Sequence, residues 1–147
     1  MYTSGTTGRP KGVMHSHLSV YLPLLGNVID YGTRASDVCN VTLPLFHCAQ
    51  HCSLAGAFLA GSTAVMMRTV DPAALLEAIE REKITVILSL PPIYALMLDH
   101  PARAGKDLSS LRLCVYGMMQ MSEPLLKRLV SEICPNFCLL YTSLARR

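Results

Sequence analysis

The sequence predicts an α/β fold in which a mostly parallel β-sheet is flanked by helices. Short apolar runs, the usual signature of buried strands, alternate with longer segments whose apolar residues recur at helical spacing. Parallel strands need a crossover helix between them, so this alternation favours a parallel sheet. A hydrophobic content of 51% over 147 residues is enough for a substantial buried core.

The first predicted helix runs from residue 15 or 16 to about residue 31, where Gly32 can end it. Pro23 lies within it and is expected to kink the helix or to mark its true first turn. The apolar positions recur at three- and four-residue spacing, which predicts a buried face. These positions are Leu18, Tyr21, Leu22, Leu25, Val28 and Ile29.

The next segments predict a strand over residues 38–44, a small-residue helix over residues 50–59 and a second strand over residues 62–67. Asp71 can then cap a helix that has Pro72 at its first position, which is a favoured arrangement. The buried face of this helix is predicted to consist of Leu75, Leu76 and Ile79.

The second half of the chain continues the alternation of strands and helices. Residues 85–90 are predominantly apolar, as expected for a parallel strand buried on both faces, and Pro91 can open the helix that follows. The remaining predicted elements are a strand over residues 111–116, a helix over residues 123–133 capped by Ser122, and a strand over residues 137–141.

Composition and charge exclude several classes of protein. The net charge is only +3 and the basic residues are scattered, so no nucleic-acid partner is expected. No uninterrupted apolar run is long enough to span a membrane, and no secretory signal opens the chain. The six cysteines lie in apolar runs and helix-like segments, where a thiol behaves as a small buried hydrophobe. We therefore expect a reduced, cytoplasmic protein.

Residues 3–13 combine hydroxyl groups, glycines and a lysine within a few positions. Hydroxyl groups can donate hydrogen bonds to phosphate oxygens, and glycines let backbone N–H groups surround an anion. Lys11 adds a positive charge. The segment differs from the Walker A loop, because Gly12 rather than Ser or Thr follows the lysine. The pattern predicts a polyphosphate-binding loop, with a plain surface turn as the alternative.

The whole of residues 3–13 resembles the phosphate-binding signature of the AMP-forming adenylating enzymes. This superfamily includes acyl-CoA synthetases, aryl-CoA ligases, firefly-type luciferases and peptide-synthetase adenylation domains. The resemblance implies an internal part of the large, multilayered N-terminal domain of an acyl-CoA synthetase. It also implies that ATP phosphates are bound by Thr3, Ser4, Gly5, Thr6, Thr7, Gly8 and Lys11. Lys11 and Thr7 are expected to act in catalysis, with Lys11 offsetting phosphate charge and assisting the departure of pyrophosphate.

Residues 43–47, which end the first predicted strand, are similar to a second motif of the same family. In its acyl- and aryl-CoA ligases, a strand that ends in a proline, an aromatic residue and a histidine reaches the acyl-adenylate. The resemblance implies that Phe46 and His47 bind the carboxylic acid, with His47 beside the carboxylate and not acting as a general base. Peptide-synthetase adenylation domains usually carry an aspartate-bearing motif here, which favours a CoA ligase.

Residues 116–122 stand where the family has a glycine-rich loop against the adenine ring. By this resemblance Gly117, Met118 and Met119 are expected to bind the nucleotide. Met118, Met119 and Gln120 replace the small residues and the proline of that loop, although methionine can lie against a flat ring. The alternative is that Met119 and Met121 fill space in the core.

The segment that follows Phe46 contains residue types that can bind zinc. Cys48 and Cys52, or His47 and His51, are four residues apart and could share one face of a helix. Zinc needs four ligands, usually supplied as two spaced pairs, and the sequence does not indicate a second pair. We therefore expect no metal site in this chain.

The resemblance also divides the chain. Residues 1–137 are expected to form part of an AMP-binding domain, and residues 138–147 a non-native tail. The family continues here into Tyr-Gly-x-Thr-Glu, whose glutamate binds magnesium, whereas Tyr141 is followed by Thr-Ser-Leu-Ala. Residues 138–143 also resemble the translation of a sequencing-library adaptor.

The function implied by the resemblance is that of an ATP-dependent, AMP-forming carboxylate-CoA ligase. A carboxylic acid, ATP and CoA would be its substrates, with Mg²⁺ as cofactor. The family's ribose-binding aspartate, interdomain hinge and C-terminal-domain lysine are not in this chain. We therefore expect it to be inactive alone and to need the remainder of its N-terminal domain and the C-terminal domain.

Three alternatives stay open at this point. The parent protein could be an adenylation domain that activates an amino acid or an aryl acid, although Phe46, Met66, Ile93 and residues 118–121 favour an apolar acid without an amino group. The chain could also be a non-catalytic nucleotide-binding fragment, or an unstable reading-frame product with no role of its own. ATP-induced thermal stabilisation would favour nucleotide binding.

Overall fold

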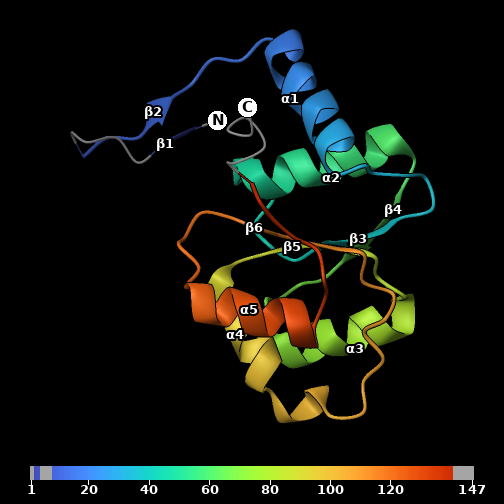
Figure 1. Ribbon diagram of the computed structural model, residues 1–147. Coiled ribbons are helices and arrows are strands. Elements are labelled where there is room, and N and C mark those ends of the chain that lie inside the picture. Colours follow the sequence, from blue (N-terminus) through green and yellow to red (C-terminus); the bar gives the residue numbers. More distant parts are fainter. Residues whose placement is uncertain (1, 4–7, 141–147) are drawn as a thin grey trace.

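The centre of the fold is a five-stranded parallel β-sheet (Figure 1). The computed structural model describes residues 2, 3 and 8–140. The strands of the sheet are β3 (Val38–Val41), β4 (Thr63–Met66), β5 (Val86–Ser89), β6 (Leu113–Tyr116) and β7 (Phe137–Leu139). They lie in the order β4-β3-β5-β6-β7, and every neighbouring pair is parallel.

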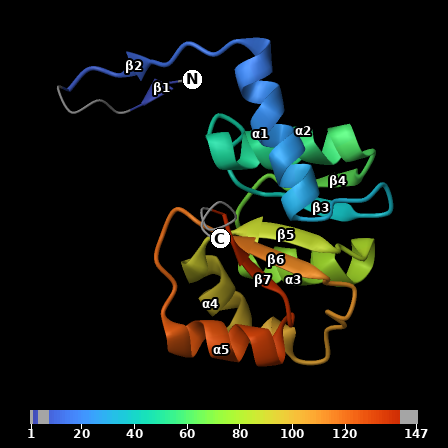
Figure 2. The same cartoon turned by 45° about the horizontal axis from the view of Figure 1, so that its top comes forward.

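Helices cover both faces of the sheet (Figure 2). One layer consists of α1 (His17–Asp30) and α2 (Cys48–Ala60), and the other of α3 (Pro72–Glu82), α4 (Pro91–Asp99) and α5 (Glu123–Glu132). A short 3-10 helix, η1 (Pro101–Arg103), follows α4. The predicted α/β class, with a parallel sheet and flanking helices, is confirmed. Within residues 8–140, none of the helices is long and apolar enough to cross a membrane.

A small antiparallel hairpin precedes these layers. Its strands are β1 (Tyr2–Thr3) and β2 (Lys11–Gly12), which pair Tyr2 with Gly12 and Thr3 with Lys11. The sequence pattern did not predict these strands, because two residues are too few to show a periodicity. The hairpin brackets the segment with the phosphate-binding signature and projects from the layered body (Figure 1).

Local capping explains where the helices begin. Ser16, Asp71 and Ser122 each accept a hydrogen bond from a backbone N–H in the first turn of the helix that follows. The caps predicted at Asp71 and Ser122 are confirmed. Helix α2 begins at Cys48, earlier than predicted, because His47 and not a Ser, Thr, Asp or Asn residue serves as its N-cap.

The buried face predicted for α1 is wrong. Leu24 is the buried residue of this helix. Four of the predicted face residues are exposed: Leu18, Tyr21, Leu22 and Ile29. The helix packs against α2 with one side while its outer side faces solvent (Figure 2). Apolar periodicity therefore identified the helix but not the side that packs.

The main core lies between the sheet and the layer of α3, α4 and α5. The face predicted for α3 is confirmed, since it is at most 1% exposed at Leu75, Leu76 and Ile79. Tyr94 of α4 is fully buried, and its hydroxyl lies 3.1 Å from the carbonyl oxygen of Ile87 and 3.0 Å from that of Val115. The Tyr94 hydroxyl therefore contacts both β5 and β6 from the face of the sheet that α3, α4 and α5 cover.

An ion pair closes the amino edge of the sheet. Asp37 precedes β3 and is only 3% exposed, and the guanidinium of Arg112 donates to both of its carboxylate oxygens. The same guanidinium donates to the carbonyl oxygens of Tyr31 and Gly32 at the end of α1, at 3.1 Å each. The hydroxyl of Thr85 also donates to Asp37 (2.8 Å). One carboxylate therefore links the starts of β3, β5 and β6 to α1.

These contacts hold the pKa of the Asp37 carboxyl below its ordinary value. Burial alone would raise that pKa, but hydrogen bonds from Arg112, from the Arg34 backbone and from Thr85 outweigh it. Because the pKa is lowered on folding, Asp37 stabilises the fold above its unfolded pKa of about 3.9. This contribution is lost as the pH falls through the lower pKa of the folded state.

Replacing Asp37 by Asn should lower the free energy of unfolding by about 3 kcal/mol at neutral pH, because Arg112 loses its anionic partner. Urea denaturation would measure the difference, which should shrink in acid as the wild-type carboxyl becomes protonated. Asp99→Asn is the matched control, since Asp99 is an exposed partner of Arg128 at 2.9 Å. It should change the free energy by less than about 1 kcal/mol. Equal losses in both variants would contradict the prediction.

Candidate functional site

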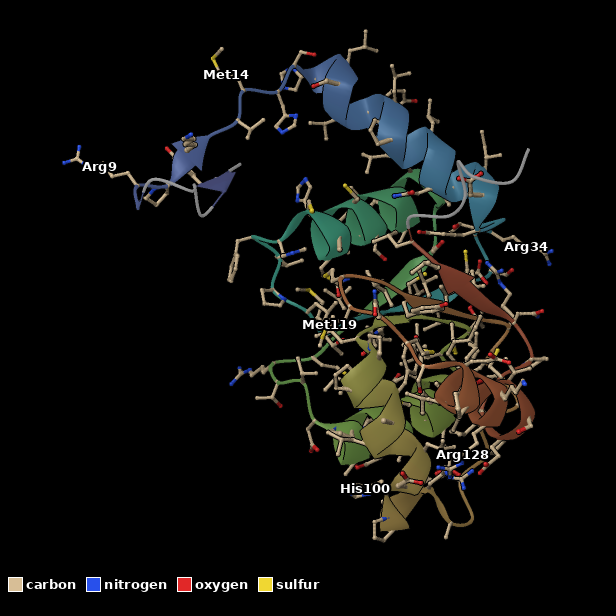
Figure 3. The ribbon with its side chains drawn as sticks, turned by 60° about the vertical axis from the view of Figure 1, so that its left-hand side comes forward. Arg9, Met14, Arg34, His100, Met119 and Arg128 are labelled. Carbon is tan, nitrogen blue, oxygen red and sulfur yellow. The ribbon has the colours of Figure 1, made fainter. Side chains whose placement is uncertain are left out.

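The carboxyl ends of the parallel strands meet at one edge of the sheet. Figure 3 shows the two edges apart, with Met119 after β6 on one side and Arg34 shortly before β3 on the other. Ligands of open α/β sheets bind outside the carboxyl ends of the strands. The predicted residues Phe46 and His47, after β3, therefore share an edge with residues 117–119, after β6.

Asn40 joins β3 to β5 at this edge. Backbone pairing between the two strands is limited to Cys39 and Val86. One residue further, the Asn40 side chain accepts from the N–H of Leu88 (2.8 Å) and donates to the Leu88 carbonyl oxygen (3.2 Å). A buried side-chain amide thus replaces the backbone partner that β5 lacks. Sequence analysis did not select Asn40, although an amide inside an apolar strand was a usable signal.

The loop between β3 and α2 carries Phe46 and His47. Nδ1 of His47 accepts a hydrogen bond from the N–H of Ala49 (3.2 Å), so the imidazole caps α2. The N–H of His47 donates to the carbonyl oxygen of Pro44 (3.0 Å), which closes the loop as a tight turn. Capping occupies Nδ1, so Nε2 is the nitrogen with which His47 can meet a ligand.

A cavity of about 420 Å³ opens between α1 and the start of α2. This volume lies within the usual range for small-molecule sites, about 300–1,000 Å³. Its lining contains no acidic residue and is mostly apolar, with contributions from Val20, Pro23, Leu45, Phe46 and the thiols of Cys48 and Cys52. Phe46 therefore lines the cavity, whereas His47 lies at the N-terminus of α2, whose first turns line the cavity.

The loop after β6 begins with two unusual backbone positions. A Cβ atom on Gly117 would lie 3.0 Å from the Cβ of Leu140, the residue after β7, so a larger residue would require Leu140 to shift. Met118 has a φ of 65°, in the left-handed region that non-glycine residues seldom occupy. Its side chain packs against a buried cluster that includes Leu43 and Ala49. This contact connects the β6 loop to the region of β3 and α2.

The other methionines of this loop differ in their surroundings. Met121 packs against the main core, in agreement with the space-filling alternative. Met119 is 52% exposed and is not a core residue. Together with Tyr116, Met118 and Gln120, these two residues line an open cavity of about 630 Å³ beside β7. The loop therefore presents sulfur-containing side chains to a space large enough for a planar ligand.

The predicted phosphate-binding residues are only partly described. Ser4, Gly5, Thr6 and Thr7 lie outside the described residues, as does the side chain of Thr3. Gly8 has a φ of 81°, a left-handed conformation in which glycine is strongly favoured. Lys11 is exposed on β2. In Figures 1 and 2 the hairpin projects on the side of the body where the loop between β6 and α5 also lies.

The thiols and imidazoles near the cavity do not form a metal site. Among the described residues, no group of three or more His, Cys, Asp or Glu side chains is arranged to hold a metal ion. Cys48 Sγ lies 3.9 Å from Nδ1 of His47, and burial, together with the neighbouring Cys48, raises the pKa of the Cys52 thiol. Cys39, Cys48, Cys52, Cys114 and Cys134 form no disulfide. The zinc arrangement considered from the sequence is therefore not assembled in the described part of the chain.

The sequence matches a known family and several characterised relatives. A family model described as AMP-binding enzyme matches residues 1–142. A feruloyl-CoA synthase of an Amycolatopsis species is 35% identical over 118 residues, which are 80% of this chain and 24% of that protein. The 4-coumarate--CoA ligase 1 of Oryza sativa subsp. japonica is 35% identical over 127 residues, covering 83% of this chain and 22% of that protein. The chain thus spans about a quarter of the length of these relatives.

Solved structures agree with this match. The inhibitor-bound N-terminal domain of FACL13 from Mycobacterium tuberculosis superposes with a TM-score of 0.85 at 30% identity, covering 95% of this chain and 34% of that chain. The o-succinylbenzoate CoA synthetase MenE from Bacillus subtilis, in complex with ATP and magnesium, superposes with a TM-score of 0.80 at 28% identity. That superposition covers 90% of this chain and 27% of MenE.

Gly117→Ala should lower the free energy of unfolding by about 1–2 kcal/mol, because the added methyl group crowds Leu140. Gly26→Ala is the matched control. Gly26 lies inside α1, and a Cβ there would meet nothing within 4 Å. The control should therefore raise the free energy of unfolding by about 0.5–1 kcal/mol through helix propensity. Denaturant titration would compare the two variants, and a stabilised Gly117→Ala protein would refute the close approach.

Proposed function

This chain belongs to the AMP-binding enzyme family, and we propose that it forms the pyrophosphate end and part of the acyl side of an ATP-dependent carboxylate-CoA ligase. The observation that supports this most is the set of loops after β3 and β6 at one sheet edge, with strands β1 and β2 on the same side. The relatives named as CoA synthases and ligases support the same reaction.

The proposed reaction has two steps. A carboxylate oxygen attacks the α-phosphorus of ATP, and the bond to the β-phosphate oxygen breaks, so that pyrophosphate leaves and an acyl-adenylate forms. The thiolate of CoA then attacks the acyl carbonyl carbon, and AMP leaves as the thioester forms. Both steps develop negative charge on oxygen, so positioning and electrostatic stabilisation by fixed groups are the main contributions of the protein.

We assign the phosphate groups to the segment within the hairpin. The hydroxyl groups of Thr3, Ser4, Thr6 and Thr7 and the backbone N–H groups of Gly5 and Gly8 would hold the β- and γ-phosphates. The left-handed backbone at Gly8 supports this role, because such a conformation can turn successive N–H groups toward one anion. Lys11 would offset the charge that builds up on departing pyrophosphate.

The cavity beside α2 is assigned to the acyl group of the substrate. Its apolar wall, with Phe46 and Leu45, suits an aliphatic or aromatic chain, and it offers no carboxylate to bind an amino group. An apolar acid without an amino group is therefore favoured over an amino acid. His47, at the start of α2, would face the carboxylate through Nε2.

The adenine ring is assigned to the loop after β6. Gly117 brings this loop close to β7, and Met118 and Met119 line the adjacent cavity, where their side chains can lie against a flat ring. The described carboxylates do not gather into a set that would hold Mg²⁺. We keep Mg²⁺ as the proposed cofactor of the full-length enzyme, where it would offset phosphate charge.

Exposed apolar side chains on the outer side of α1 support the view that the chain works within a larger domain. Leu18, Tyr21, Leu22 and Ile29 together form an apolar surface of a kind that isolated soluble domains seldom expose. We therefore propose that the rest of the N-terminal domain and a C-terminal domain complete the enzyme. Residues 138–147 remain a proposed non-native tail, although Cys138 and Leu139 pair in β7.

The isolated chain should form no detectable acyl-adenylate, whereas the full-length protein that contains it should. Release of pyrophosphate from ATP, measured with a panel of aryl, aliphatic and amino acids, would test both statements. Aryl or aliphatic acids should support release, and Lys11→Met should reduce the rate by about a hundredfold or more, because one charge that stabilises the leaving group is lost. Release with amino acids alone would replace the CoA ligase by an amino-acid-activating enzyme.

In the full-length protein, His47→Asn should separate capping from substrate binding. Asparagine is a favourable N-cap, so the melting temperature should stay near the wild-type value. Adenylation should nevertheless fall by about tenfold or more, because the imidazole at the carboxylate is gone. His47→Ala should lose both the cap, at a cost of about 1 kcal/mol, and the activity. Full activity in His47→Asn would show that His47 is only a helix cap.

A further inference from the structure

Gln50 connects the start of α2 to the end of β3. It is the third residue of α2 and is fully buried. Its Oε1 atom accepts hydrogen bonds from the backbone N–H groups of Leu43 (3.0 Å) and Thr42 (3.3 Å). Both N–H groups lie beyond Val41, the last residue of β3, at buried positions where the strand no longer pairs. One oxygen atom therefore satisfies two buried donors that the sheet leaves free.

Hydrogen bonds fix both ends of the segment that carries Phe46 and His47. The segment leaves the sheet at Leu43, which Gln50 holds, and it enters α2 through the cap of His47 on Ala49. Between these points, the bond from His47 N–H to the Pro44 carbonyl oxygen closes the turn. The backbone of the segment is thus fixed at its exit from the sheet, at its turn and at its entry into the helix.

The polar contacts continue from Gln50 into the sheet. The Asn40 side chain donates to the hydroxyl oxygen of Thr42 (2.9 Å), and it binds the backbone of Leu88 in β5 through both its Nδ2 and its Oδ1 atoms. A continuous buried hydrogen-bond network therefore runs from α2 through β3 to β5; it consists of Gln50, Thr42 and Asn40. Ser89 of β5 is also buried near this edge, but the three polar side chains of this network are joined by hydrogen bonds, which gives them a role beyond packing.

Only the oxygen of the Gln50 side-chain amide forms hydrogen bonds with the described residues. Its Nε2 atom is buried and has no hydrogen-bond partner among the described residues, while Oε1 accepts twice. A residue selected for packing alone would not leave a buried donor unpaired. The position therefore requires the acceptor, and a glutamate carboxylate at this third helical residue would supply the same acceptor.

We propose that Gln50 is a positioning residue for the acyl-adenylate site: its Oε1 holds the exit of β3 so that Phe46 and His47 keep their place at the substrate. The inference rests on the proposed ligase function, and it adds a residue that does not line the proposed acyl cavity. A shift of the pinned backbone would move Phe46 in the cavity wall and His47 at the carboxylate together. Binding and activation of the acid then depend on Gln50, whereas binding of ATP does not.

The test compares Gln50→Leu with Gln50→Glu in the full-length protein. Hydrogen exchange of the Thr42 and Leu43 amides should become about tenfold faster or more in the leucine variant and stay near wild type in the glutamate variant. In pyrophosphate release, the leucine variant should show a KM for the acid raised about tenfold, with the KM for ATP within about twofold. The glutamate variant should restore the KM for the acid.

The outcomes separate the two proposals. A leucine variant that is less stable but keeps the wild-type KM for the acid would overturn the positioning role. The same holds if the KM values for acid and ATP rise together, or if the glutamate variant fails to restore binding of the acid. A wild-type protein without activity on any acid would refute the proposed function, and unchanged exchange of the Thr42 and Leu43 amides in the leucine variant would refute the role of Gln50 independently.

Discussion

The arrangement of this chain depends on the ion pair between Asp37 and Arg112. The two residues are 75 positions apart, and their contact brings the starts of β3 and β6 together with the end of α1. Thr85 adds the start of β5 to the same carboxylate. Because Asp37 is almost fully buried, its charge has to be compensated by these groups, and the amino edge of the sheet has one way to close.

Closing the amino edge in this way leaves the opposite edge available for ligands. At the carboxyl edge the backbone departs from regular pairing and geometry, as Asn40 between β3 and β5 and Met118 with its left-handed φ both show. Such departures have a cost in stability and persist where the surrounding structure holds them in place. Here the buried hydrogen-bond network of Gln50, Thr42 and Asn40 stabilises the end of β3, and the close contact of Gly117 with Leu140 stabilises the loop after β6.

Histidine 47 shows how one residue can serve both the fold and the proposed site. Its Nδ1 is committed to the helix through Ala49, which fixes the orientation of the ring and leaves Nε2 for a ligand. A catalytic or binding histidine is commonly oriented through its second nitrogen in this manner. The start of α2 is therefore also the place where the proposed acyl site and the helical layer are joined.

The sequence by itself determined most of the elements and the family resemblance of residues 3–13. Helix starts at Asp71 and Ser122, the buried face of α3 and the buried strand β5 were predicted because capping and periodicity depend on residues a few positions apart. Residues 3–13 carried the family resemblance for the same reason. The hairpin around them was not predicted, since its strands are too short to show a pattern.

Only the tertiary structure decided which sides and which partners these elements use. The packing side of α1 was wrongly predicted because apolar residues surround much of that helix, and only packing against α2 decides which side is covered. The sequence did not point to Asn40 because its partner Leu88 is 48 positions away and becomes a neighbour only when β5 lies beside β3. It did not point to Gln50 because the backbone at residues 42–43 becomes a neighbour only when α2 folds back on the end of β3. The order of the strands and the reversal of the chain between β3 and α2 bring these groups together, and local sequence patterns predict neither of them.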